Sequence, residues 1–397
     1  MALTRRSLAL SALFSGAAVG LASPAAAKAV VKEVPKVPAG VDKTARPAFT
    51  AADSDATTVA GIAGARFAAD DAAAFLAALG NDAGIGRDPW LTLSGGGSNG
   101  AFGAGLVAGW TATGRRPIFS VVTGISTGAL TAPFAFAGPQ HDPALRAAYT
   151  EVDAADIFEF GATPESLLDT WPLAKLIERN ITPALLADIA AGHRAGRRLF
   201  VITTNVDTGR AVGWNLGAIA VAGGPAAAKL FRDVLLASSS IPGIFPPTHI
   251  AVEANGRTFS EMHVDGGVTS AFFVAPEPMV ATGSALPARQ VYAVVNNSTA
   301  PDFAVTPRMT LTVLGRAMAA AVKAATRMAI AVHESYAART GLDLRIASIP
   351  ENFKAVERGP FDHLYMKALF AFAAGEMRDG AAFDRSRVGP QVTASAR

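Results

Sequence analysis

Residues 90–100 read WLTLSGGGSNG, and residues 118–128 read IFSVVTGISTG. In both stretches a short run of strand-forming residues ends in a glycine-rich turn. An apolar segment with helical spacing follows each turn, over residues 99–113 and 126–136. Two successive strand–turn–helix units predict a βαβ unit, whose strands are parallel neighbours joined by a right-handed crossover. Both turns should then lie at the carboxyl edge of one sheet, where such folds place their functional sites.

The rest of the chain continues the alternation of strands and helices. Further strands are expected over residues 198–205, 211–216, 258–264, 290–296 and 344–349. Further helices are expected over residues 60–79, 143–191, 227–237 and 309–339. The sequence shows no internal repeat, so this pattern predicts a single α/β domain.

The first residues have the features of an export signal. Arg5 and Arg6 precede an apolar stretch over residues 7–21, which is shorter than a membrane span, and Ala25-Ala26-Ala27 offers a small-residue cleavage site. We expect export to the periplasm or the medium, through the twin-arginine route or as an ordinary secretory protein. The chain is divided into a signal peptide (1–27), a Pro/Ala-rich linker (28–58), a helical lead-in (59–84), one α/β domain (85–383) and a disordered tail (384–397).

Composition excludes several classes of function. The chain has 397 residues and no cysteine, so thiol nucleophiles, disulfides and thiolate metal sites are excluded. None of the six histidines forms a His-x-x-x-His pair, and we therefore expect neither a metal nor a cofactor. Basic residues do not gather with aromatic residues into a block, which argues against a nucleic-acid partner.

The second glycine turn has the pattern Gly-x-Ser-x-Gly over residues 124–128. This pattern places a serine at a strained strand-to-helix turn, where glycines avoid clashes with the neighbouring backbone. A serine hydroxyl becomes an effective nucleophile only when it is held in place and its proton is removed. Because a strand precedes the turn and a helix follows it, Ser126 is the candidate nucleophile.

The first glycine turn has two functional interpretations. Gly95, Gly97 and Gly100 formally satisfy the dinucleotide-binding pattern, but that pattern needs an acidic residue about twenty positions later. Residues 89–141 contain no Asp or Glu. The other interpretation is an oxyanion site, in which the backbone amides of Gly96 and Gly97 approach a developing negative charge. A tight turn that packs a helix on a strand is the structural alternative.

The base can come from one of two places. In an α/β-hydrolase the order is Ser, acid, His, so that His333 or His363 would complete a triad. His333 lies within an Ala- and Met-rich helix, however, and His363 begins another apolar helix. Asp265 instead ends a strand and precedes Gly266 and Gly267, so its carboxylate can reach the same edge as Ser126.

These three turns, in this order, resemble the motifs of the patatin-like phospholipase family. The resemblance covers Gly95-Gly96-Gly97-Ser98-Asn99-Gly100, Gly124 to Gly128, and Asp265-Gly266-Gly267. It implies a three-layer α/β/α patatin-like fold with a mixed, mostly parallel central sheet. It also implies Ser126 as nucleophile, Asp265 as proton acceptor without a histidine, and the Gly95, Gly96 and Gly97 amides as the oxyanion site. Many members carry Arg or Lys where this chain has Asn99, so a cation that would hold a lipid phosphate is missing.

The expected function is that of a lipid acyl hydrolase of phospholipase or lipase type, acting through an acyl-Ser126 intermediate. Its partners would be a lipid ester and, transiently, a membrane or micelle surface. Two alternatives remain open: a catalytically idle lipid-binding protein on the same scaffold, and a Ser-His-Asp esterase of α/β-hydrolase type. No amphipathic helix stands out in the sequence as a membrane-docking face.

Overall fold

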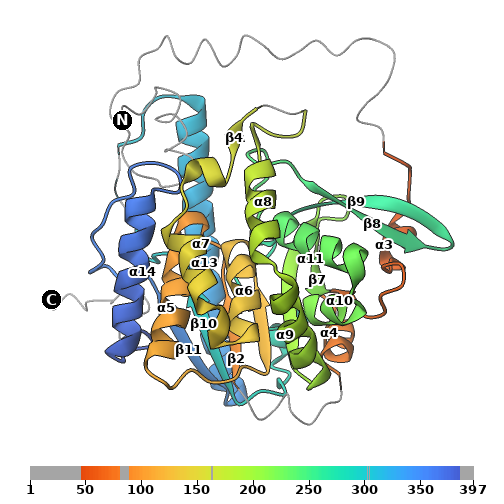
Figure 1. Cartoon of the computed structure of the whole chain (residues 1–397), viewed down its shortest axis with the longest axis horizontal. Coiled ribbons are helices and arrows are strands. Elements are labelled where there is room, and N and C mark those ends of the chain that lie inside the picture. Colours follow the sequence, from red (N-terminus) through yellow and green to blue (C-terminus); the bar gives the residue numbers. More distant parts are fainter. Residues whose placement is uncertain (1–45, 81–88, 162–163, 302, 304, 385–397) are drawn as a thin grey trace.

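The computed structural model describes residues 46–80, 89–161, 164–301, 303 and 305–384. The predicted signal peptide, most of the linker, the end of the lead-in and nearly all of the tail lie outside these ranges. Within them, the chain folds into a central sheet with helices on both faces (Figure 1).

Nine strands of the described residues form the sheet, in the order β1-β7-β6-β3-β2-β10-β11, with β9 pairing with β6 and β8 pairing with β9. The run from β6 to β11 is parallel, whereas β1, β7, β8 and β9 pair antiparallel. The predicted mixed, mostly parallel sheet is therefore confirmed. The strands are β1 Arg66–Ala68, β2 Trp90–Leu93, β3 Val121–Gly124, β6 Arg198–Asn205, β7 Arg210–Asn215, β8 Thr248–Ala254, β9 Arg257–Asp265, β10 Gln290–Val295 and β11 Asp343–Ser348.

Alternate side chains of the central strands enter two separate cores, as expected for strands buried on both faces. Leu91 and Val122 pack with the first group of helices, while Trp90 and Val121 pack with the second. The first group is α5 Gly100–Ala112, α6 Thr127–Ala137, α7 Asp142–Thr150, α8 Trp171–Asn180, α9 Pro183–Arg194, α10 Leu216–Ala222, α11 Gly224–Ser238 and α14 His363–Arg378. The second group is α4 Ala72–Leu79, α12 Glu277–Thr282 and α13 Thr310–Thr340. The three predicted layers are thus present.

The predicted βαβ unit consists of β2, α5 and β3. The two strands are parallel neighbours, and their register pairs Trp90 with Val121 and Leu93 with Gly124. Because the paired strands end at the same level, the two glycine turns leave the sheet side by side at its carboxyl edge. The sequence pattern alone was sufficient to predict this arrangement.

Residues 60–79 do not form the single helix that their apolar spacing predicted. Gly61 and Gly64 have φ of 68° and 65°, which interrupts any helix before β1 begins. Strand β1 then pairs antiparallel with β7, and α4 begins only after Asp71, whose side chain caps its first turn. Pairing with a distant strand therefore overrode the local pattern.

The last part of the predicted linker, residues 46–58, is packed against the sheet. It contains helix α3 Ala51–Asp55, and Phe49 stacks on Phe259 of β9 with ring centroids 4.5 Å apart. Thr58 exchanges backbone hydrogen bonds with Glu253 of β8. This segment belongs to the folded body and corrects the expected linker boundary at residue 58.

Strand β8 was not expected from the sequence. It forms a hairpin with β9 through Asn255 and Gly256, both in the left-handed region with φ of 52° and 73°. Such an Asn-Gly pair is the preferred two-residue hairpin turn. Within the described ranges, no helix is both long enough and apolar enough to cross a lipid bilayer.

Candidate active site

Ser126 lies on a sharp turn between β3 and α6. Its backbone has φ 54° and ψ −128°, a conformation that residues with a side chain rarely adopt. The Ser126 N–H donates to Ser238 Oγ over 2.9 Å, and the Ser238 hydroxyl donates to the carbonyl of Ile202 over 2.7 Å. The unusual turn is therefore held by β6 and by the end of α11, as expected where backbone strain is retained at a site.

The two glycines of the Gly-x-Ser-x-Gly turn are required by close packing. A Cβ atom built on Gly124 would lie 2.6 Å from the Gly128 carbonyl oxygen. One built on Gly128 would lie 2.3 Å from the carbonyl oxygen of Leu93. Larger residues would separate α6 from the sheet, so this pattern sets how closely the helix N-terminus approaches β2.

The glycine loop at the end of β2 faces the Ser126 side chain. A Cβ atom built on Gly95 would lie 3.1 Å from Ser126 Cβ and 3.7 Å from Ser126 Oγ. In the part of the chain that the structure describes, the amides of Gly95, Gly96 and Gly97 have no hydrogen-bond acceptor. Half-buried donors without acceptors are costly to maintain. Beside a hydroxyl, they form the arrangement needed to stabilise an oxyanion.

Asn296 supports this loop from the neighbouring strand. It follows β10 directly and is fully buried. Its N–H donates to Ser94 Oγ and its Nδ2 donates to the Ser94 carbonyl, each over 2.8 Å, while its Oδ1 accepts from the Gly103 N–H over 2.9 Å. The backbone of Asn296 also approaches so closely that a Cβ on Gly96 would lie 2.1 Å from its carbonyl oxygen.

Asp265 ends β9 and lies beside Ser126. The Ser126 side chain is hydrogen-bonded to the Asp265 carboxyl, whose Oδ1 also accepts the Gly267 N–H over 2.7 Å. The Asp265 backbone is fixed by Ser240, whose carbonyl accepts its N–H, and by Thr204, whose hydroxyl donates to its carbonyl. The structure therefore brings together the three turns that the sequence analysis selected.

The environment of Asp265 makes its carboxylate more basic than usual. Burial raises the pKa of Asp265 to about 6, although the hydrogen bonds from Ser126 and Gly267 lower it. Only 6% of this residue is exposed, and Ser126 is 7% exposed. A carboxylate with a pKa near neutrality is better matched to proton transfer at physiological pH than one near 4.

None of the candidate histidines is hydrogen-bonded to the serine or the aspartate. His333 is bonded through Nδ1 to the carbonyl oxygen of Ala329 in its own helix and packs against Phe272. His363 is bonded through Nε2 to the carbonyl oxygen of Thr150. His333 Nε2 is buried and has no hydrogen-bond partner among the described residues. The contacts of the two histidines provide no support for a serine–histidine triad.

Two side chains of the glycine loop contact the C-terminal part of the chain. The Tyr365 hydroxyl donates to Asn99 Oδ1 over 2.6 Å. Ser98 is hydrogen-bonded to the carboxyl of Glu357, a buried residue. Burial raises the pKa of Glu357 to about 7, although the Ser98 bond lowers it. Asn99, the residue that replaces the Arg or Lys of many patatin-like proteins, is thus paired with a phenol hydroxyl.

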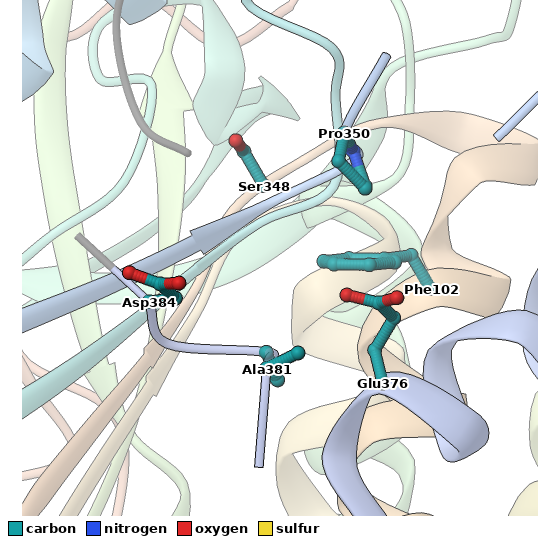
Figure 2. Close-up of a pocket in the computed structure, with 7 residues that line it drawn as sticks. Phe102, Ser348, Pro350, Glu376, Ala381 and Asp384 are labelled. Carbon is teal, nitrogen blue, oxygen red and sulfur yellow. The ribbon is translucent and has the colours of Figure 1, made fainter. Parts of the chain in front are cut away.

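The described residues contain no group of three or more His, Asp or Glu side chains arranged to hold a metal ion. A small cavity of about 10 Å³ lies between α5, α14 and β11 (Figure 2). Ser126 and Asp265 are not among its lining residues. Its volume is that of about one water molecule. It is too small for an organic substrate, although Phe102, Glu376 and Asp384 are among its lining residues.

Asn296, Glu357 and Ser238 were not among the predicted site residues. For Asn296 a signal existed, because it is a polar residue placed directly after a buried parallel strand. The register of β10 with β2 puts it beside the glycine loop. Glu357 and Ser238 reach the site from loops or helix ends far away in the chain, where no local pattern marks them.

Comparisons with known proteins show what this chain is similar to. Residues 91–276 match the family model described as patatin-like phospholipase. Among solved structures, VipD from Legionella pneumophila is similar, with 12% sequence identity, a TM-score of 0.38, and coverage of 74% of this chain and 67% of VipD. A search of curated proteins found no match.

Proposed function

We propose that this chain, whose residues 91–276 form a patatin-like phospholipase domain, hydrolyses carboxylic esters of lipids through Ser126 and Asp265. The family supports lipid acyl hydrolysis in general. The assignment of roles depends on one observation: the Ser126 hydroxyl is hydrogen-bonded to a buried carboxylate beside amides that have no acceptor.

In the first step, Ser126 Oγ attacks the carbonyl carbon of the ester while its proton passes to the Asp265 carboxylate. An aspartate of ordinary pKa, near 3.9, is a weak base toward an alcohol. The pKa of about 6 for Asp265 reduces this mismatch. The hydrogen bond between the two side chains also provides the short path that proton transfer requires.

The carbonyl oxygen becomes an oxyanion when the tetrahedral intermediate forms. We assign the amides of Gly95, Gly96 and Gly97 as its donors. One such donor typically lowers the barrier by about 3 to 4 kcal/mol. The Ser126 amide is not available for this purpose, because it donates to Ser238.

Collapse of the intermediate breaks the ester C–O bond, and the leaving alcohol takes the proton from Asp265. The acyl group is then on Ser126 Oγ. In the second step Asp265 accepts a proton from water, the resulting hydroxide equivalent attacks the acyl carbon, and Ser126 recovers its proton as the fatty acid leaves. Atoms and charges balance without a histidine or a cofactor.

The headgroup preference depends on what surrounds the glycine loop. Ser98 and Asn99 contact Glu357 and Tyr365. Neither partner is a cation, so the loop provides no positive side chain at these positions for a lipid phosphate. Incubation of the protein with mixed phospholipids and neutral glycerides, with lipid products measured by mass spectrometry, distinguishes the two substrate classes.

The proposed roles are tested by changing Ser126→Ala. Hydrolysis of a p-nitrophenyl acyl ester should fall to the background rate, and a fluorophosphonate probe should no longer label the protein. Mass spectrometry of the labelled unaltered protein should find the probe on Ser126. Labelling elsewhere, or full activity of the variant, would exclude the mechanism.

We also propose that the protein is exported, because Arg5, Arg6 and the apolar stretch that follows have the composition of an export signal. N-terminal sequencing of the protein recovered from its native host should find cleavage near Ala27. Recovery of an uncleaved cytoplasmic form would contradict this proposal.

A further inference from the structure

The first two thirds of helix α13 expose an apolar surface to solvent. Six large apolar side chains between residues 313 and 332 are between 39% and 66% exposed, and the exposed residues between them are mostly alanines. Single exposed apolar residues are common, but a continuous patch on one element marks an interaction site. The six are Val313, Leu314, Met318, Val322, Met328 and Val332.

These residues share one side of the helix. At 100° per residue, the six positions fall within one half of the helix circumference. Thr312, Thr326 and Ile330 lie on the opposite half and are buried against the body. A surface helix of a water-soluble domain normally turns its polar side outward. Here the outward side is apolar, and packing among the described residues does not account for it.

The charge on this segment has one sign. Residues 303–333 contain no Asp or Glu, whereas Arg308, Arg316, Lys323 and Arg327 are basic. Their spacing places Arg316, Lys323 and Arg327 on a single stripe along one flank of the apolar side. Arg308 and Arg327 are exposed and form no salt bridge within the described residues. The segment thus combines an apolar side with a cationic flank.

The exposed part of α13 lies at the edge of the sheet that carries Ser126. Strand β10 ends at this edge, where Asn296 holds the glycine loop, and residues 297–309 lead from there to the helix. Lys323 and Arg327 contact the carbonyls of Ala300 and Thr299 in that connection, each over 3.4 Å. In Figure 1 the first turns of α13 extend past α5 and α6 on this side.

We propose that this side of α13 docks the protein on an anionic lipid surface. The apolar side chains would enter the boundary between headgroups and acyl chains, and the basic flank would contact the headgroups, as in other interfacial amphipathic helices. Docking would bring the edge that holds Ser126 to the surface where lipid esters reside. Only this last consequence rests on the proposed function; the docking itself does not.

Charge favours a lipid surface over a second copy of the chain. An acid-free cationic segment is attracted to anionic headgroups, and each Lys or Arg near the surface adds to this attraction. An identical copy would bring the same cations toward one another without an acidic partner in the segment. Self-association through α13 is therefore the competing outcome in the test.

The test measures vesicle binding by the full chain carrying Ser126→Ala, so that no result depends on turnover. Vesicles of phosphatidylcholine containing phosphatidylglycerol are compared with vesicles of phosphatidylcholine alone in a sedimentation assay. We expect binding to the anionic vesicles at least about tenfold tighter, and weaker in high salt. Equal binding to both vesicle types, or no binding, would overturn the proposal.

A second comparison locates the docking surface. Leu314→Glu with Met328→Glu places two carboxylates on the apolar side and should reduce binding at least about tenfold. Ile118→Glu is the matched control, because Ile118 is 67% exposed and lies just before β3, at the opposite edge of the sheet. All variants share the same N-terminal residues, so any vesicle binding by that segment is equal in all of them. Differences in binding between the variants therefore come from α13. Loss of binding in the control but not in the α13 variant would overturn the assignment.

A third variant guards against misfolding of the second. Arg308→Gln with Arg327→Gln leaves the apolar side intact and should weaken binding to anionic vesicles several-fold, without changing the circular dichroism spectrum. Sedimentation velocity of the unaltered chain without lipid should show no dimer formed through α13. A dimer of this kind would dissociate in the Leu314→Glu, Met328→Glu variant. Such a dimer, together with unchanged vesicle binding, would assign α13 to self-association instead.

Discussion

Two buried carboxylates on β9 differ sharply, although they lie four residues apart on the same side of the strand. Glu261 is fully buried and Asp265 is 6% exposed, so burial raises the pKa of both. For Glu261, the hydrogen bond from His263 and the charge of Arg66 outweigh burial and lower the pKa to about 2. Among the described residues, no cation lowers the pKa of Asp265, which is about 6.

The comparison shows how one strand provides both a structural anion and a candidate base. Glu261 also accepts a hydrogen bond from Ser54 of α3, and Arg66 belongs to β1. The ion pair therefore ties the N-terminal segment to the strand that delivers Asp265. Within the described part of the chain, the Asp265 carboxyl accepts hydrogen bonds from one hydroxyl and one amide, both neutral donors. A buried carboxylate without a neighbouring cation keeps a raised pKa and can therefore serve as a base.

The largest expected effect is on the rate of ester hydrolysis, which should fall far more when Asp265 is changed than when Glu261 is changed. Asp265→Asn removes the proposed base and should lower kcat/KM on a p-nitrophenyl ester by about 10⁴-fold, as when a catalytic carboxylate is neutralised in other serine enzymes. Glu261→Gln should lower it by less than about tenfold, because that side chain does not contact Ser126. Steady-state kinetics of the two purified variants provide the measurement. Equal losses in both would remove the distinction between a base and a structural anion.

The second effect is on the unfolding free energy, and it concerns the structural role of Glu261. Glu261→Gln leaves the nearly buried Arg66 without its counterion, and breaking such a pair costs about 3 to 5 kcal/mol in unfolding free energy. Urea unfolding of the variant measures this loss. The double change Arg66→Met with Glu261→Leu should recover much of it, since apolar replacements of a buried pair are often neutral. No recovery would mean that hydrogen bonds to Ser54 and His263, not the ion pair, hold this region.

A third effect tests whether catalysis needs the glycine-loop amides in addition to Asp265. Gly96→Ala would put a methyl group 2.1 Å from the Asn296 carbonyl oxygen, so the loop amides must move while Asp265 keeps its place. We expect kcat to fall by about 10²-fold or more, as for the loss of one oxyanion donor. Gly161→Ala is the control, because a Cβ there meets no atom of the described residues within 4 Å. An active Gly96→Ala variant would rule out the assigned oxyanion site.

Much of this site was predictable because its parts are local. A strand, a glycine turn and a helix occupy about twenty consecutive residues around Gly95 and again around Ser126, and their spacing determines their geometry. Asp265 could be selected for the same reason, since it ends a strand before two glycines. The parallel register of β2 and β3 then followed from the crossover rule.

The surroundings that set the chemistry were not predictable. The pKa of Asp265 depends on which cations are absent around it, and the pair of Arg66 and Glu261 joins residues 195 positions apart. Strand β1 has three residues and no pattern of its own. The exposed side of α13 could not be recognised either, because an Ala- and Met-rich helix has the same composition whether it is buried or exposed. Such features depend on tertiary contacts, which sequence periodicity does not report.

The fourth effect concerns pH. If Asp265 is the base, as proposed, its carboxylate form is required, and kcat/KM should rise about tenfold per pH unit below a midpoint near 6 and level off above it. The contribution of Asp265 to the unfolding free energy should change with pH in the opposite direction to kcat/KM. A carboxyl whose pKa is raised on folding holds more protons in the folded state, so its contribution to stability falls as the pH rises from about 4 to 6. Asp265→Asn should abolish this stability change. Glu261, with its lowered pKa, should contribute fully above about 4.5 and lose its contribution only toward pH 2.

The smallest effects are expected at the two histidines that an α/β-hydrolase triad would use. His363→Ala removes a bond to the Thr150 carbonyl, and His333→Ala removes one to the Ala329 carbonyl; neither imidazole is bonded to Asp265. Rates should stay within about twofold of the unaltered protein in a p-nitrophenyl ester assay, because neither change alters the proton path. His333 is packed against Phe272, so its truncation should still lower the unfolding free energy by about 1 kcal/mol or more. If His333→Ala loses activity because part of the protein is unfolded, the activity should return at lower temperature. A loss of about 10³-fold in a fully folded variant would instead indicate that a histidine is the base and that Asp265 only orients it.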